Sequence, residues 1–373
     1  MTDELTPEPD RIDGAPHPRD TPEIFGQDAA QAGFLTAFNS GHLHHAWLIT
    51  GPKGTGKATL AWSIARFLLA TPLADSAGLF GAPPPVETLA IDPEHPVARR
   101  MRSGAEQGLF VLRRPYDDKA KRLKQEITVD EARKMKGFFA LSSADGGRRV
   151  VIVDAADEMN VNAANAILKI LEEPPAKTTI LMVAHRPSAL LPTIRSRCRE
   201  LRLAPLSVQD IARALDQAGI DTAGQTDALA ALAAGSAGEA MRLCLLEGPK
   251  LYAELIATFA GLPRLDRRRA LTLADSAAAR GAEERRKLVH SLTALFLARL
   301  ARTGAIGAPP SPEAAPGEAT LLARLAPDSA AARRWAEAAE LIGARARHGA
   351  AVNLDPAALI LDTLFKIQKT AAA

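Results

Sequence analysis

The stretch AWLITGPKGTGKATL, residues 46–60, decides the fold. It begins with a short apolar run, and residues 51–57 then match the phosphate-binding pattern G-x-x-x-x-G-K. The apolar residues that follow recur at the spacing of one helix face: Leu60, Ile64, Phe67 and Leu68. A strand, a glycine-rich loop and a helix in this order predict a P-loop.

The residue types of this loop suit a nucleotide. Glycines let backbone N–H groups surround phosphates at a helix N-terminus, and a lysine reaches the terminal phosphates. An acid that ends a second apolar strand usually accompanies Mg²⁺. The candidate nucleotide-binding residues on this reasoning are Gly51, Gly54, Thr55, Gly56, Lys57 and Asp154.

Two positions depart from a hydrolysing P-loop. Ala58 stands where a Ser or Thr usually binds Mg²⁺, and Ala155 stands where ATPases of this type commonly have a Glu that activates water. Asp157 and Glu158 are interpreted as ordinary acids at a helix start. Because a general base contributes about 10²- to 10⁴-fold, we expect ATP or ADP to bind weakly and not to be hydrolysed.

The rest of the chain predicts an α/β region followed by helices. Apolar runs at 109–112, 150–153 and 180–184 are typical of buried parallel strands, and helical patterns lie between them. Beyond residue 204 only helical patterns remain. The predicted domains are a disordered acidic tail (1–20), a P-loop domain with a parallel sheet (21–203), a helical lid (204–262) and a C-terminal all-α oligomerisation bundle (263–373). Residues 303–318 are interpreted as a loop.

Composition sets wider limits. Hydrophobic residues make up 47% and charged residues 24% of the 373, which excludes a fibrous or wholly disordered protein. Two cysteines, Cys198 and Cys244, exclude a disulfide scaffold and a four-cysteine zinc module, and indicate a reducing compartment. With no secretory signal and no apolar run of about 18 residues, we expect a cytoplasmic protein without a membrane segment.

Further motifs lie on both sides of the P-loop. In chain order they are Gly26-Gln27, His45-Ala-Trp-Leu48, NAILKILEEPP at 165–175 and Ser196-Arg197-Cys198. Together with the P-loop they resemble the bacterial clamp-loader subunits of DNA polymerase III, of the AAA+ class, most nearly the delta-prime type. The resemblance is dense from residue 23 to 203 and only architectural beyond. It implies that Arg197 acts in trans as an arginine finger, whose charge stabilises the γ-phosphate transition state in a neighbouring subunit.

The resemblance also places His185 at the first sensor position, where it either hydrogen-bonds a phosphate or caps the strand. Tau/gamma motor subunits carry a complete P-loop, an Asp-Glu pair, a zinc module and a lid arginine after Gly-Ser. This chain has Ala58, Ala155 and Gly238 at the corresponding places and no cysteine between residues 71 and 126. We therefore expect no zinc, and a metal-free loop at 72–107.

The implied role is that of a partner. The chain would join tau/gamma and delta subunits in a hetero-oligomeric ring that loads the sliding clamp onto primed DNA. No independent catalysis is expected, and DNA polymerase activity would belong to the whole complex.

Alternatives stay open. One is an ATP-hydrolysing AAA+ motor such as a divergent tau/gamma subunit, in which Thr59 or water would replace the metal ligand and Glu158 would act as the base. Another is a stand-alone DNA-binding module, which the aromatic content of 4% disfavours. The stretch 113–136 has nine Lys or Arg against five acids. It predicts either a contact with DNA phosphates in the ring or a solvated helix face.

Overall fold

The computed structural model describes residues 7–12, 14–72, 84–140 and 147–373. These form two compact units, one of Met1–Gly219 with Gly235–Gly238 and one of Ile220–Ala234 with Glu239–Ala373. The units divide the chain at places other than the predicted domain boundaries, so the lid at 204–262 stays a prediction.

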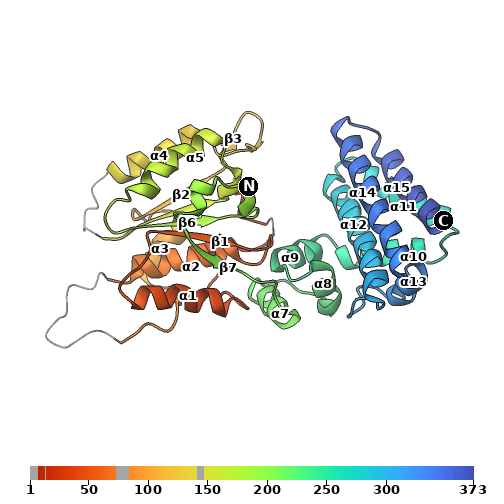
Figure 1. Ribbon diagram of the computed structural model, residues 1–373, viewed down its shortest axis with the longest axis horizontal. Helices are drawn as coiled ribbons and strands as arrows, with labels where there is room; N and C mark the ends of the chain where they lie inside the picture. Colours follow the sequence, from red (N-terminus) through yellow and green to blue (C-terminus); the bar gives the residue numbers. More distant parts are fainter. Residues whose placement is uncertain (1–6, 13, 73–83, 141–146) are drawn as a thin grey trace, which may run out of the picture. The chain divides into compact units, whose positions relative to one another are not determined.

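A five-stranded parallel sheet lies at the centre of the first unit (Figure 1). In spatial order its strands are β2 (Leu109–Arg113), β5 (Arg149–Asp154), β6 (Thr178–Val183), β1 (Ala46–Thr50) and β7 (Arg199–Arg202). Every residue of β1 and β6 is buried, as the continuous apolar runs predict. The predicted parallel sheet is confirmed, whereas the charged edge strand β7 was not expected.

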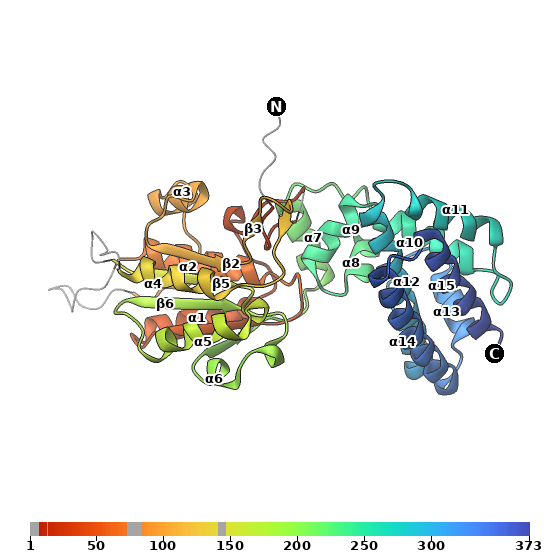
Figure 2. The same cartoon turned by 90° about the horizontal axis from the view of Figure 1, so that it is seen from above.

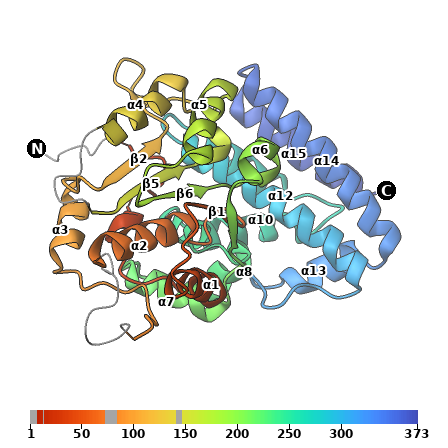
Figure 3. The same cartoon turned by 60° about the vertical axis from the view of Figure 1, so that its left-hand side comes forward.

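Helices cover both faces of the sheet (Figure 3). On one face lie α1 (Asp28–Asn39), α2 (Lys57–Ala70) and α3 (Pro96–Ser103), and on the other α4 (Val129–Ala140), α5 (Val161–Glu172) and α6 (Pro192–Arg195). Trp47 and Ile49 pack in the first layer, and Ala46 and Leu48 in the second, because successive strand residues face opposite sides. The unit also contains α7 (Val208–Gln217), with Ser207 as its N-cap.

Residues 7–12 and 14–20, called here the N-terminal strap, differ from the expected disordered tail. They include a short 3₁₀ turn (Pro18–Asp20) and pack on α2 and the end of β2. Asp10 accepts a hydrogen bond from Trp62 Nε1 at 3.2 Å and pairs with Arg113 at 3.2 Å. Burial would raise the pKa of Asp10, but His17 and Arg113 lower it to about 2. The acids of this segment are held by His17 and Arg19 within the segment and by Arg113, which is distant in the sequence.

The segment 72–107 also differs from the expected loop. Residues 73–83 lie outside the described part, but α3 occupies Pro96–Ser103. His95 caps this helix by accepting from the N–H of Val97, and Val97 and Met101 are buried against α2. Proline at the first helical position was the sequence signal for this helix.

The stretch 113–136 is only partly helical. After β2 the chain forms a small antiparallel hairpin of β3 (Tyr116–Asp117) and β4 (Arg122–Leu123), and α4 begins at Val129. A helix face therefore accounts for the second half of this basic stretch alone.

The second unit is entirely helical over its described residues (Figure 2). Its helices are α8 (Thr226–Ala233), α9 (Ala237–Leu245, the first residues of which belong to the first unit), α10 (Gly248–Phe259), α11 (Arg267–Ala278), α12 (Glu283–Ile306), α13 (Glu318–Leu325), α14 (Ser329–Ala351) and α15 (Pro356–Ala371). Helix α14 packs on α12 and α15, and α15 also packs on α11. Asp355 and Pro356 begin α15 as predicted, the Asp355 side chain accepting from Ala358 N.

A buried ion pair organises the region predicted as a loop at 303–318. Helix α12 continues to Ile306, and Glu318, which is fully buried, begins α13. The Glu318 carboxylate accepts from Arg299 at 2.6 and 3.0 Å, from Tyr252 at 2.6 Å and from the N–H of Ala314 at 2.7 Å. Both carboxylate oxygens are satisfied, so the connecting segment is fixed to α12 and α10.

None of the helices in the described ranges is both long enough and apolar enough to cross a bilayer.

Candidate functional site

The P-loop backbone approaches its neighbours too closely for side chains. A Cβ on Gly51, whose φ is +137°, would lie 2.6 Å from the carbonyl oxygen of Leu203. A Cβ on Gly54, whose φ is +77°, would lie 2.1 Å from Ser236 Oγ. Only glycine combines these dihedral angles with this packing, so the predicted loop is formed between β1 and α2.

Gln27 holds the loop to the chain that leaves β7. Its side chain is 3% exposed. Its Nε2 donates to the carbonyl oxygens of Thr55 at 3.2 Å and Ala204 at 2.8 Å, and its Oε1 accepts from Ala204 N at 3.1 Å. The sequence pointed to Gln27 only through the Gly-Gln motif and did not predict this contact, since its partners are backbone groups.

Lys57 is folded back onto its own loop. Its side chain is 3% exposed, and Nζ donates to the carbonyl oxygens of Gly51 at 2.7 Å and Pro52 at 2.6 Å. Burial lowers the pKa of Lys57 to about 8, although Asp154 and Asp157 oppose the decrease. To reach a phosphate, the amine must leave these two carbonyls.

The loop keeps donors for an anion. Within the described chain, no acceptor takes a hydrogen bond from the backbone N–H of Gly54, Thr55 or Gly56. The Thr55 hydroxyl, in contrast, donates to Pro52 O at 2.9 Å. Three N–H groups at the start of α2 fit phosphate oxygens, so the residues present are compatible with ATP or ADP.

Asp154 ends β5 as predicted, but its charge is suppressed. It is almost fully buried, and burial, together with the charges of Asp10 and Glu158, raises its pKa to about 7. Its Oδ2 has no hydrogen-bond partner in the described structure. The carboxyl group therefore faces Lys57 as a weak acid and not as a permanent anion.

The acids after Asp154 are engaged elsewhere. Asp157 accepts from the backbone N–H of His185 at 2.9 Å and of Arg186 at 3.1 Å, which ties the end of β5 to the end of β6. Glu158 pairs with Arg114 at 2.6 Å. Asp157 thus bridges the ends of β5 and β6. The sequence analysis interpreted it as an ordinary acid at a helix start and did not predict this bridge.

His185 lies beside the loop at the end of β6. Burial and the charge of Lys57 lower the pKa of His185 to about 4, so the ring is neutral at pH 7. Its Nδ1 is buried and has no partner in the described chain. Its backbone N–H holds the strand end through Asp157, while the ring remains open to a ligand.

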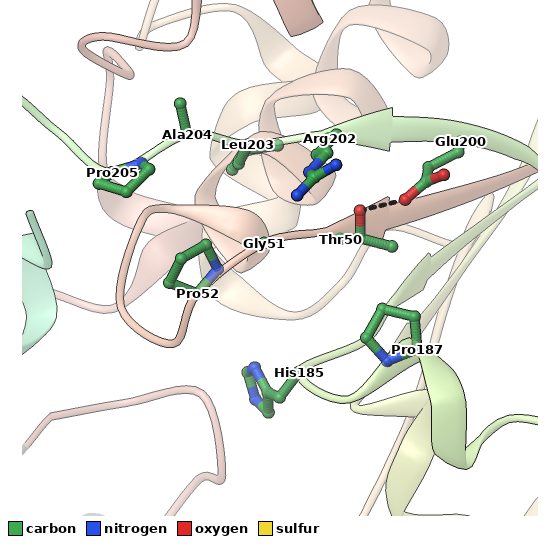
Figure 4. Close-up of a pocket in the computed structure, with 10 residues that line it drawn as sticks. All are labelled: Thr50, Gly51, Pro52, His185, Pro187, Glu200, Arg202, Leu203, Ala204 and Pro205. Carbon is green, nitrogen blue, oxygen red and sulfur yellow. Dashed lines mark hydrogen bonds between the residues drawn. The ribbon is translucent and has the colours of Figure 1, made fainter. Parts of the chain in front are cut away.

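A pocket of about 670 Å³ opens next to the first two loop residues (Figure 4). Its lining comes from the ends of β1, β6 and β7: Thr50, Gly51, Pro52, His185, Pro187, Glu200, Arg202, Leu203, Ala204 and Pro205. The hydroxyl of Thr50, the last residue of β1, donates to Glu200 of β7 at 2.5 Å. The volume is in the range of small-molecule sites.

Gly238 lies directly on the P-loop. Its N–H donates to Gly54 O at 3.0 Å, and a Cβ at Gly238 would lie 3.1 Å from Gly54 Cα. The resemblance places a lid arginine of motor subunits at this position. Here the backbone of Gly54 occupies that space, so a long side chain at this position requires the P-loop or the segment around Gly238 to move.

Arg197 stands apart from these residues. It follows α6 and is half-buried, and its Nη1 donates to Thr193 O at 2.9 Å while Nη2 pairs with Glu172 at 2.8 Å. The structure thus brings the loop residues, Asp154 and His185 together, and leaves Arg197 on the surface formed by α5 and α6.

Residues 26–207 match the family model described as DNA polymerase III, delta subunit. This part of the chain is similar to that family. Within the described residues, no group of three or more His, Cys, Asp or Glu side chains could hold a metal ion.

Similar proteins come from several bacteria. The chain is 38% identical to DNA polymerase III subunit delta' of Pseudomonas aeruginosa over 205 residues, 53% of this chain and 55% of the relative. It is 30% identical to subunit delta' of Bacillus subtilis over 45% of each chain. Subunit tau of Salmonella typhimurium is 31% identical over 53% of this chain and 28% of its own. The matched part spans about half, or less, of these relatives.

A solved gamma-subunit-related protein of DNA polymerase III from Thermotoga maritima covers 91% of this chain and 99% of its own, at 16% identity and a TM-score of 0.41. A likeness at this score carries no functional argument.

The raised pKa of Asp154 predicts an unusual pH dependence. The native state binds this proton more tightly than the unfolded state, in which the pKa of the carboxyl group is near 3.8. The proton's contribution to stability is complete below pH 3.8 and is lost as the pH rises through 7. We compare the free energy of unfolding of Asp154→Asn with that of the wild type. We expect the difference in favour of the variant to increase by about 3 kcal/mol from pH 4.5 to pH 7.5.

Urea unfolding at the two pH values measures this difference. Asp130→Asn, at an exposed position of α4, serves as the control and should show no such change. An Asp154→Asn advantage that is equal at both pH values would show that the carboxyl is ionised throughout.

Proposed function

We propose that the chain is a clamp-loader subunit of DNA polymerase III, of the delta-prime type, that does not hydrolyse ATP itself. It would lie in a ring with tau/gamma and delta subunits in the cytoplasm and present Arg197 to the ATP of a neighbouring tau/gamma subunit. The ring would load the sliding clamp onto primed DNA. In this proposal residues 204–262 act as the lid and 263–373 join the ring.

The observation that carries the proposal is a P-loop without groups for hydrolysis. Ala58 offers no oxygen to Mg²⁺, and Ala155, which is buried, offers no base. Of the nearby acids, Asp157 is held by backbone N–H groups and Glu158 by Arg114. Weak binding of ATP or ADP through the loop N–H groups and Lys57 is compatible with this geometry, but turnover is not supported.

The half-buried Arg197 supports the second part of the proposal. An arginine finger needs a planar, permanent charge at a defined position on the subunit surface. Arg195 and Arg199, two residues away on each side, are exposed, whereas Arg197 is held by two contacts. If Arg197 were an ordinary surface arginine of a basic run, we would expect it to be as exposed as Arg195 and Arg199.

The alternative, an ATP-hydrolysing motor, requires Glu158 to act as base. That role would break its pair with Arg114. It also requires Lys57 to leave two carbonyl acceptors before each turnover. No contact of the described residues favours this alternative.

Hydrolysis by the purified chain alone tests the first part. With Mg²⁺, and with or without primed DNA, we expect a rate that equals that of the Lys57→Ala variant, because no residue activates water. A DNA-stimulated rate of about one per second that disappears in Lys57→Ala would contradict the proposal and identify a motor.

Replacing Arg197 by Ala in the reconstituted ring tests the second part. Arginine fingers contribute about 10³- to 10⁵-fold to the rate, so hydrolysis at the adjoining tau/gamma site should be lost while the ring still assembles. Arg195→Ala is the matched control, since it removes an exposed arginine two residues away and should change nothing. An assembled Arg197→Ala ring with wild-type hydrolysis would refute the role of Arg197.

The hairpin of β3 and β4 supports contact with DNA as a further part of the same function. Its exposed cations are Lys119, Lys121, Arg122 and Lys124, and none of them forms an ion pair with an acid in the described chain. Asp117 Oδ1 accepts from the N–H groups of Lys119 and Ala120, both at 3.0 Å. A projecting turn with free cations fits a phosphate backbone.

Salt-dependent DNA binding by the assembled ring measures this contact. The double variant Lys119→Gln/Lys121→Gln should weaken binding and reduce the slope of log K against log salt by roughly 1.5, for two lost phosphate contacts. The control, Arg133→Gln/Lys134→Gln, removes cations that are already paired with Asp130 and Glu131. Equal slopes for the two double variants would exclude the hairpin from the DNA interface.

A further inference from the structure

Glu172 and Arg197 form an ion pair across two helices. The carboxylate at the end of α5 lies 2.8 Å from Arg197 Nη2, and the Thr193 carbonyl of α6 accepts from Nη1 at 2.9 Å. The two terminal nitrogens of the guanidinium are therefore held from two different elements. Two contact points fix the plane of the group as well as its position.

The support under Glu172 is rigid. Pro174 and Pro175 end α5 directly after Glu173, because proline has no N–H to continue the helix. Leu171, the residue before Glu172, is buried, and its carbonyl oxygen is hydrogen-bonded to His45 Nε2 at 2.9 Å. Helices α5 and α6 also pack on each other.

The pairing is selective. Glu173 is the next residue along the chain and is also exposed, yet it has no ion-pair partner among the described residues. On the other side, Arg199 lies over the ring of Trp47 and not against an acid. Among the charged side chains of the motifs at 165–175 and 196–198, Glu172 and Arg197 form an ion pair with each other.

We propose that Glu172 is a positioning residue that orders Arg197 before the neighbouring nucleotide arrives. The inference rests on the proposed function of Arg197 as a finger. A free arginine loses rotamer freedom when it binds a phosphate, and ordering it beforehand removes part of that loss. The hydrogen bond to Thr193 uses one of the five N–H donors, and with the ion pair to Glu172 at Nη2 at least three remain for phosphate oxygens. Water screens the half-exposed carboxylate, so its negative charge opposes this effect only weakly.

Hydrolysis by the reconstituted ring, stimulated by primed DNA and clamp, tests the proposal. Exposed pairs are individually weak, so Glu172→Gln should lower kcat by roughly two- to fivefold and leave the KM for ATP unchanged, since the nucleotide binds in the other subunit. Glu172→Asp should recover part of the rate. Glu173→Gln is the matched control, with the same loss of charge one residue away, and should behave as the wild type.

A double-mutant cycle separates this inference from the proposed function. In the Arg197→Ala background, Glu172→Gln should have no further effect. If Arg197→Ala alone leaves hydrolysis unchanged, the proposed function fails. If Arg197→Ala abolishes hydrolysis but Glu172→Gln leaves or raises kcat, or still lowers the residual rate in that background, only the positioning role is wrong.

A second measurement needs no ring. In the ¹⁵N-arginine-labelled chain, the Nε–Hε signal of Arg197, assigned by its loss in Arg197→Lys, should show restricted motion. The ¹⁵N heteronuclear NOE of this signal should fall in Glu172→Gln and not in Glu173→Gln. An unchanged NOE in Glu172→Gln would overturn the proposal.

Discussion

The side-chain amide of Gln27 is the contact on which the candidate site depends. It bonds the P-loop at Thr55 to the chain that leaves β7 at Ala204, and it does so with both its donor and its acceptor. Because the group is buried, its loss would leave backbone groups without partners in the interior. The backbone bonds from Leu203 to Thr50 and from Gly238 to Gly54 hold the same loop beside this connection.

The resulting site has the shape of a nucleotide-binding loop, but it lacks the charged groups that hydrolysis requires. Three loop N–H groups have no acceptor within the described chain, yet Lys57 bonds to carbonyls, Asp154 holds a proton near neutral pH and His185 is neutral. Arg197 lies apart from the loop, on the surface formed by α5 and α6. The nucleotide-binding loop and the guanidinium of Arg197 thus occupy separate places within one domain.

The strands at 46–50, 150–153 and 180–184 could be predicted because buried parallel strands carry unbroken apolar runs. Strand β7 could not, since only Leu201 of its four residues is buried and the others read as a charged surface segment. The same limit holds at the site. Glycines and Lys57 follow a local pattern, whereas the bonds of Asp157 and Gln27 depend on elements that meet only after folding.

The N-terminal strap has a practical consequence for producing the protein. By sequence alone, a chain shortened to begin at residue 21 loses an acidic extension. In the folded unit it would strip Arg113 of two carboxylates and uncover the indole of Trp62 on α2. An exposed aromatic ring beside an unpaired cation favours self-association, so such a shortened form should be harder to keep in solution than the full chain.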